Sequence, residues 1–376
     1  MILFLRGLLL NLRRRSEIIK ERLLEIPDDS DLNDYVARSY QQVEDIRRRL
    51  DALINDSDLG EPRLLPNYLQ AFRECTETLT VVEHYGLPQA ERFTSADRRL
   101  TRLCRRLVIE CEWPLPPPLV SAASSDHYWT SPYFNLVCVP ALEERTLLSL
   151  PDLAHELGHI LLFHEESQIM GDFRVILARY IASEKQRVST EQRPPEYESR
   201  YHELFRTWSD RWVFEFACDM IATYMVGVAF VFQHVRLCVG YGHASIHHPC
   251  LGSSGDHPAD DARFRGSVAV LERLSAPRKQ IQRIEELWLS YLETNTKPKP
   301  PDYEFCYPQH LINELAECTI GGMRRVGVRC YSDFEITPNF SSIIALLQSA
   351  WLNFDESPLT YQTWEDDQLQ MLWNEL

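Results

Sequence analysis

Apolar residues recur every three or four positions through most of the first 112 residues. The pattern runs through 31–53, 67–84 and 95–111, with charged residues at the positions between. This spacing is typical of helices that bury one face and expose the other. The apolar residues 1–10 are followed, not preceded, by three arginines, so we interpret them as a docked helix and not as a signal peptide. We therefore predict a helical N-terminal region, 1–112.

The pattern changes at 113–118, where four prolines in six residues exclude a helix. Two short β-like stretches follow, around 127–130 and 133–139, and the second ends at Pro140. A helix comes next, with Ser149 as its candidate N-cap. Further helical patterns cover 171–188, 197–239, 259–274, 279–294, 307–318, 339–353 and 363–375. This succession predicts an α+β fold that is mostly helical and has a small sheet beside the helix that follows it.

A stretch rich in lysine and proline, 296–301, reads as a linker. It separates a middle domain, 113–296, from a C-terminal helical region, 297–376. The middle domain holds the residues with the clearest chemical pattern.

The helix after the second β-like stretch carries the sequence His155-Glu156-Leu157-Gly158-His159. On a helix, the two histidines lie about one turn apart on one face. Two imidazoles so placed can hold one Zn²⁺ ion, and Glu156 stands beside them as a general base for the water that the metal activates. Chance alone supplies this pattern in roughly one chain in a hundred of this length. The rest of the chain must therefore decide its meaning.

A catalytic zinc site needs a third protein ligand and an open position. Glu215 lies in the otherwise apolar stretch 212–220, and Asp219 follows one helical turn later. Because burying a carboxylate is costly without a cation, we predict that Glu215 is the third ligand. Asp219 would then accept the free N–H of a ligand imidazole, that of His155. The alternative is a helix edge on which both carboxylates point into solvent.

His257 and Arg263 lie six residues apart, where a histidine-rich loop ends and the helix 259–274 begins. An imidazole and a guanidinium close to the metal would stabilise the oxyanion of a tetrahedral intermediate. By itself the His-Pro pair is a weak signal, and a solvent-exposed loop histidine is the default interpretation of His257.

Taken in order, His-Glu-Leu-Gly-His, Glu215-Phe-Ala-Cys-Asp219 and His257-Pro with Arg263 six residues on resemble the gluzincin metallopeptidases. The closest pattern is that of the catalytic domain of the HtpX-type and CAAX prenyl endopeptidases, and the ImmA/IrrE-type regulators are more distant. The resemblance covers about 130–275. It implies a zincin-like core in which one zinc ion is held by two histidines and Glu215, with His257 and Arg263 at substrate. It also implies a strand that pairs with extended substrate, for which 133–139 is the candidate.

We therefore predict a zinc-dependent endopeptidase that hydrolyses peptide bonds of a protein substrate, with Glu156 as general base. The alternative is a catalytically silent zinc-binding regulatory or scaffold protein of the same fold. The N-terminal helices are the candidate site for a regulatory partner.

Composition limits the possible partners and the cellular location of the protein. The net charge of -16 argues against general binding to nucleic acid or anionic membranes. The apolar run 220–232, thirteen residues without a charge, has the length of a core helix, so we expect no transmembrane span. None of the ten cysteines forms a C-x-x-C pair. We interpret them as buried, reduced thiols of a cytoplasmic protein, although an even number also permits a disulfide framework.

Overall fold

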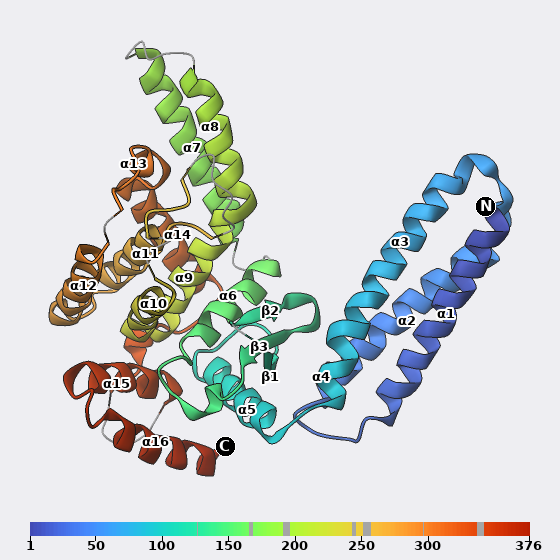
Figure 1. Ribbon diagram of the computed structural model, residues 1–376, viewed down its shortest axis with the longest axis horizontal. Helices are drawn as coiled ribbons and strands as arrows, with labels where there is room; N and C mark the ends of the chain where they lie inside the picture. The colour runs from blue at the N-terminus through green and yellow to red at the C-terminus, as the bar shows by residue number, and fades with distance from the viewer. Residues whose placement is uncertain are drawn as a thin grey trace.

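The chain folds into a mostly helical α+β structure with one small sheet, as predicted from its sequence (Figure 1). In this computed structural model a long helical arm projects from a body that holds the sheet and the remaining helices. The structure describes residues 1–125, 127–164, 168–190, 196–242, 246–250, 257–295, 297–336 and 342–376, without the side chains of 188–190, 196–198 and 211.

The sheet has three strands, β1 (Leu119–Ser124), β2 (Trp129–Ser131) and β3 (Leu136–Pro140), in the order β1-β3-β2. β3 runs parallel to β1 and antiparallel to β2. Both edges of β3 are thus occupied, so the expectation that 133–139 pairs with substrate is wrong. β1 was not predicted, because serine and alanine make up four of its six residues and give little β signal.

The body contains α5 (Ser95–Glu110), α6 (Asp152–Phe163), α7 (Ile169–Thr190), α8 (Glu196–Thr207), α9 (Val213–Val226), α10 (Val228–Tyr241), α11 (Asp260–Arg273), α12 (Arg278–Glu293), α13 (Tyr303–Cys306), α14 (Gln309–Arg325), α15 (Ile343–Glu356) and α16 (Tyr361–Glu375). The single helix predicted over 197–239 is divided at Gly227, which has a φ of 61°. A Cβ there would lie 2.6 Å from the Tyr331 ring, so both the backbone angle and the packing require glycine.

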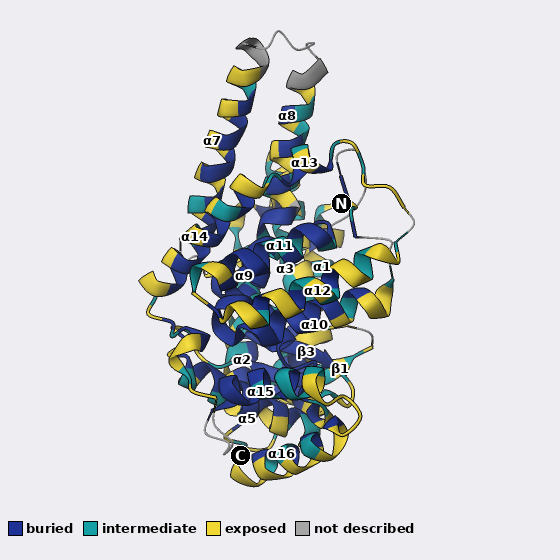
Figure 2. Ribbon diagram, turned by 90° about the vertical axis from the view of Figure 1, so that its left-hand side faces the viewer, coloured by how far each residue is buried: buried dark blue, intermediate teal, exposed yellow. Residues whose placement is uncertain are grey.

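One hydrophobic core runs from α5 to α16, and its central helices appear dark blue in Figure 2. The C-terminal helices belong to this core: Trp351 stacks on Phe232 and donates its indole N–H to the Leu148 carbonyl at 3.0 Å. Glu365 accepts the backbone N–H of Leu147 at 2.6 Å. The predicted boundaries at 112 and 296 therefore do not follow the packing, which joins α5 and the 297–376 region to the middle domain.

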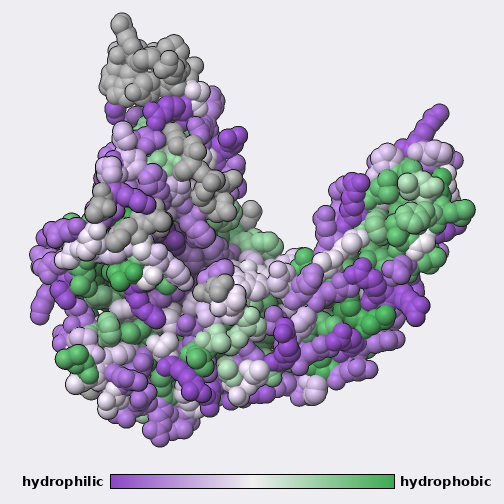
Figure 3. Space-filling model, viewed as in Figure 1, coloured by the Kyte–Doolittle hydropathy of each residue, from purple (hydrophilic) through white to green (hydrophobic). Residues whose placement is uncertain are grey.

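The arm consists of α1 (Ile2–Glu25), α2 (Asn33–Asn55), α3 (Leu65–Val81) and the short α4 (Leu87–Glu91). A cluster of buried apolar residues, among them Leu9, Val43 and Leu79, holds the helices together as their periodicity predicts, and it continues into the sheet at Leu119 and Leu136. Other apolar side chains of α1, such as Leu3 and Phe4, remain exposed. Figure 3 shows apolar patches on the arm.

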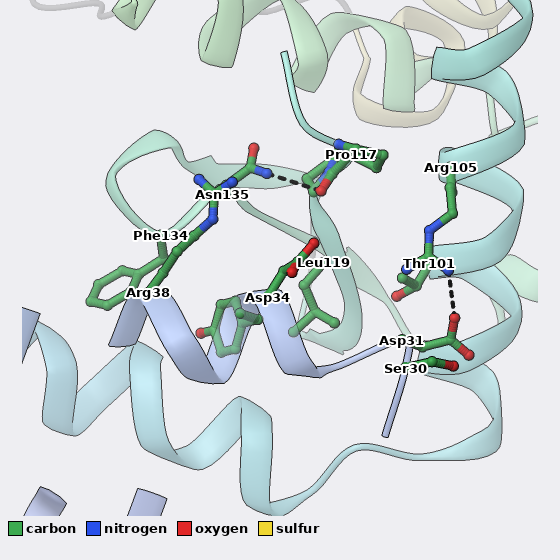
Figure 4. A pocket seen from close by; sticks show the side chains of 12 residues that line it. Ser30, Asp31, Asp34, Arg38, Thr101, Arg105, Pro117, Leu119, Phe134 and Asn135 are labelled. Carbon is green, nitrogen blue, oxygen red and sulfur yellow. Dashed lines mark hydrogen bonds and ion pairs between the residues drawn. The ribbon is translucent and has the colours of Figure 1, made fainter. Parts of the chain in front are cut away.

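Asp31 anchors the arm to the body. Its side chain is 2% exposed and forms ion pairs with three arginines of α5: Arg98 at 3.3 Å, Arg102 at 2.8 Å and Arg105 at 2.7 Å. A cavity of about 200 Å³ lies beside this junction, between α2, α5 and the start of β1 (Figure 4). A buried carboxylate is stable there because several guanidinium groups compensate its charge.

Among the described residues, no helix combines the length and the apolar character needed to cross a membrane. All ten cysteines fall within the described ranges, and they form no disulfide with one another.

Candidate metal centre

The candidate site forms where α6 and α9 pack closely against each other. A Cβ added to Gly158 of α6 would lie only 3.0 Å from the Cα and 3.2 Å from the Sγ of Cys218 on α9. The glycine inside the histidine motif is therefore what lets the two helix backbones approach. Sequence reasoning missed this contact, although small residues at facing helix positions are a usable signal for close packing.

The N-terminus of α6 lacks the side-chain cap that the sequence predicted. Pro151 occupies the N-cap position, and the Ser149 hydroxyl instead donates to the Glu143 carboxylate. The expectation that Ser149 caps the helix is therefore wrong. The Asp152 carboxylate accepts a hydrogen bond of 2.7 Å from Gln233 of α10, and burial raises the pKa of Asp152 to about 6.

Three side chains converge between α6 and α9. His155 Nε2 lies 3.2 Å from His159 Nε2 and 3.5 Å from Glu215 Oε2, and His159 Nε2 lies 3.7 Å from Glu215 Oε1. In a tetrahedral zinc site with bonds of about 2.0–2.1 Å, neighbouring donor atoms are separated by about 3.3–3.4 Å. The donor set and its spacing therefore fit one zinc ion.

Asp219 fixes the orientation of the first histidine. Its Oδ1 lies 2.9 Å from His155 Nδ1, and the carboxylate also accepts two bonds from Arg263, at 2.6 Å from Nε and 2.8 Å from Nη2. Burial raises the pKa of Asp219, but the charge and hydrogen bonds of Arg263 outweigh this and hold it well below its usual range. An ionised carboxylate can only accept, so His155 Nδ1 carries a proton. The Nε2 atom is thereby the one presented to His159 and Glu215.

The two residues expected at the oxyanion occupy different positions. The Arg263 side chain, 15% exposed, lies behind Asp219, and its Nη2 lies 3.6 Å from Glu215 Oε2. His257 Nε2 also lies 3.6 Å from Glu215 Oε2, but its side chain is 66% exposed. His257 therefore reaches the donors from the solvent side, whereas Arg263 supports them from inside the protein.

Glu156 is buried beside the donors, with 5% of the residue exposed. Within the described part of the chain, no hydrogen bond or ion pair engages its carboxylate. Burial raises the pKa of Glu156 to about 7, opposed by His155 and reinforced by the charge of Glu215. A carboxyl group without a partner is costly in such a place, and a pKa near 7 suits a general base.

Without a metal, the three donor side chains have very different pKa values. Burial lowers the pKa of His155, but hydrogen bonds to Asp219 and Glu215 outweigh it and raise the value to about 10. Burial and the nearby His155 lower the pKa of His159 to about 4. Burial raises the pKa of Glu215, but the hydrogen bond from His155 and the positive charge of Arg263 bring it down to about 2. Glu215 thus provides an ionised carboxylate, and His159 a neutral imidazole, to a cation.

Cys218 is a competing third donor, because its Sγ lies within 4.8 Å of one nitrogen of each histidine. Its thiol is fully buried, and burial raises its pKa well above the usual range. The Glu215 carboxylate oxygens lie 3.5 and 3.7 Å from the histidine nitrogens, and the low pKa of Glu215 keeps this carboxylate ionised. We therefore take Glu215 as the third donor and Cys218 as the packing partner of Gly158.

No protein-family model, curated protein or solved structure matches this chain. Functional assignment therefore depends on the geometry of the site itself.

Proposed function

We propose that this protein is a zinc-dependent endopeptidase with a gluzincin-like core. The observation that carries the proposal is the convergence of His155, His159 and Glu215 at ligand spacing beside Glu156, a buried carboxyl group with no partner among the described residues. A site that only stabilised the fold would have no use for that carboxyl group.

Zinc bound by the three donors would lower the pKa of a water molecule and polarise a peptide carbonyl. Glu156 takes the proton from the attacking water and later delivers it to the leaving amine. Its pKa of about 7 places both proton transfers within reach near neutral pH.

Asp219 and Arg263 act as positioning residues in this proposal. Asp219 accepts the N–H of His155 and so directs the opposite ring nitrogen to the metal, and Arg263 keeps Asp219 ionised. His257, exposed at the mouth of the site, is placed to contact the carbonyl oxygen of a substrate.

The strand that accepts an extended substrate is β2 in this proposal, not β3. β2 is an edge strand of the sheet and packs beside α6. An edge strand presents unpaired backbone groups with which an extended peptide can pair. A regulatory partner at the arm stays a prediction.

The test is Glu156→Gln, compared with the wild type in zinc by profiling new N-termini in a cell extract. We expect the variant to fold and bind zinc but to lose about 10²–10⁴-fold in cleavage rate, the usual contribution of a general base. Glu286→Gln on α12, whose side chain is 69% exposed, is the matched control and should cleave like the wild type. Equal cleavage by Glu156→Gln would refute the proposal, and zinc binding without any cleavage by the wild type would favour the catalytically silent alternative.

A further inference from the structure

A second cluster of metal-binding side chains lies between α10 and α11. His234 and Cys238 are one helical turn apart on α10, and Asp260 is the first residue of α11. One donor atom from each, a ring nitrogen, a sulfur and a carboxylate oxygen, all lie within 4.8 Å of one another. The Cys238 Sγ is 3.7 Å from His234 Nε2. With bonds of about 2.3 Å to sulfur and 2.1 Å to nitrogen, a tetrahedral site separates these two atoms by about 3.6 Å.

The surroundings are unusual for such polar groups. His234 and Cys238 are 5% and 4% exposed, and the Trp288 ring packs 6.1 Å from the His234 ring. The Phe264 ring stacks on the Trp288 ring, with 4.6 Å between the ring centroids, and the two rings form an aromatic wall beside the cluster. Asp260 is partly exposed, so the cluster is open to solvent at one point. A bound cation would compensate a carboxylate and a thiolate placed against an aromatic wall.

These side chains also interact without a metal. His234 Nε2 lies 3.1 Å from the Asp260 carbonyl, a hydrogen bond that ties the two helices together without a metal. The Cys238 thiol also shares a side-chain hydrogen bond with Asp260 and a contact of 3.7 Å with His234 Nε2, so the three side chains already meet in one polar cluster.

We propose that His234, Cys238 and Asp260 form a second metal site, which takes a borderline-soft divalent cation of the Zn²⁺ type and leaves one position for water. Imidazole and thiolate donors favour such a cation over Mg²⁺ or Ca²⁺. Binding replaces the proton of the Cys238 thiol, which passes to solvent. His234 Nε2 gives up its bond to the Asp260 carbonyl, and its proton moves to Nδ1 by exchange with solvent, so that the neutral ring binds through Nε2.

The position of the cluster gives this site a structural role. Asp260 begins α11, and Arg263 one turn later holds Asp219. His257 precedes Asp260 by three residues. A metal at the cluster therefore fixes the segment that carries both His257 and Arg263 to the first centre. The second site does not depend on peptidase activity, so it can be tested without a substrate.

The experiment titrates the metal-free full-length chain with Co²⁺, whose thiolate complexes give a near-ultraviolet charge-transfer band. Cys218→Ala serves as the parent, because it removes the other thiol near a candidate site while keeping the close approach to Gly158. We expect two cobalt ions per chain and a charge-transfer band. Adding Cys238→Ser should leave one ion and no band, whereas adding Glu215→Gln should weaken the other ion and keep the band.

A second variant is needed because Cys238→Ser places a serine in a buried position and could prevent folding. Asp260→Asn alters a partly exposed side chain, and it should weaken the band-forming ion by at least the roughly 10- to 100-fold that loss of an outer-shell partner costs. A parent that binds cobalt without the band, or a band that survives Cys238→Ser, would overturn the second site. Either result would leave the peptidase proposal unaffected, because that proposal is measured by Glu156-dependent cleavage.

Discussion

On the outer surface of the arm, ion pairs such as Arg22–Glu91 remain in contact with solvent, whereas at the candidate metal centre Arg263 and Asp219 pair largely inside the protein. The Arg22 and Glu91 side chains, which join α1 to α4, are 51% and 33% exposed. The Arg263 and Asp219 side chains, which join α11 to α9, are 15% and 1% exposed. Both regions are built from helices with similar apolar periodicity.

This difference in exposure explains why the metal donors lie at the buried ion pair and not in the arm. A surface ion pair is screened by water and contributes about 0–1 kcal/mol. A buried pair loses its hydration, so each member depends on the other and on its further partners. At the centre, Asp219 also pairs with the imidazole of His155, and Arg263 lies close to the carboxylate of Glu215. The contacts that compensate the buried charges therefore also hold the metal donors in place.

The largest loss of stability is expected when the ion pair between Arg263 and Asp219 is broken. Arg263→Leu leaves the Asp219 carboxylate buried without its guanidinium, and we expect a loss of about 3–5 kcal/mol in the free energy of unfolding. Arg22→Leu in the arm should cost about 0–1 kcal/mol. Urea denaturation measures both values. Equal losses in the two variants would show that burial does not separate the regions.

A smaller effect distinguishes the regions through the metal. Zinc at 100 times the dissociation constant of the His155, His159 and Glu215 centre should stabilise the wild type by about 2.7 kcal/mol through that centre, because it binds only the folded chain. Glu215→Gln should lose most of this stabilisation at the same zinc concentration, since the amide is a poor replacement for the ionised carboxylate.

Thermal unfolding with zinc and with a chelator measures this difference. Arg22→Leu, which is remote from the donors, is the control and should keep the full zinc-dependent increase. An unchanged response in Glu215→Gln would reject Glu215 as a ligand and would point to Cys218 in its place.

The smallest effects compare two helical glycines, one from each region. Gly158→Ala pushes a methyl group into the backbone of Cys218, and we expect a loss of about 1–3 kcal/mol together with weaker zinc binding. Gly7→Ala in α1 meets no atom within 4 Å and should stabilise the protein by about 0.5–1 kcal/mol through its better helix propensity. Thermal and urea unfolding give both signs, and a stabilising Gly158→Ala would show that the close approach of α6 and α9 is not needed.

Much of the fold was accessible from local pattern alone. The helical periodicity of 31–53 and of 259–274 leads to α2 and α11 within a few residues, because one buried face per helix repeats at a period that tertiary contacts do not alter. The spacing of His155 and His159 likewise places both rings on one helix face. Glu215 stood out as a carboxylate in an apolar stretch, since burial of such a group demands compensation.

Other features were decided only by tertiary structure. The break at Gly227 depends on the Tyr331 ring, which is distant in the sequence. The choice of β2 as the free edge depends on β1, whose residues carry little strand signal of their own.

Residue type and short-range spacing were enough to predict most of the helices and the candidate donors His155, His159 and Glu215. Tertiary structure decided that Arg263 supports Asp219 from within while His257 faces solvent, and that His234 and Cys238 meet Asp260. The physical reason is that buried polar groups choose their partners across helices, where distance along the chain says nothing about distance in space.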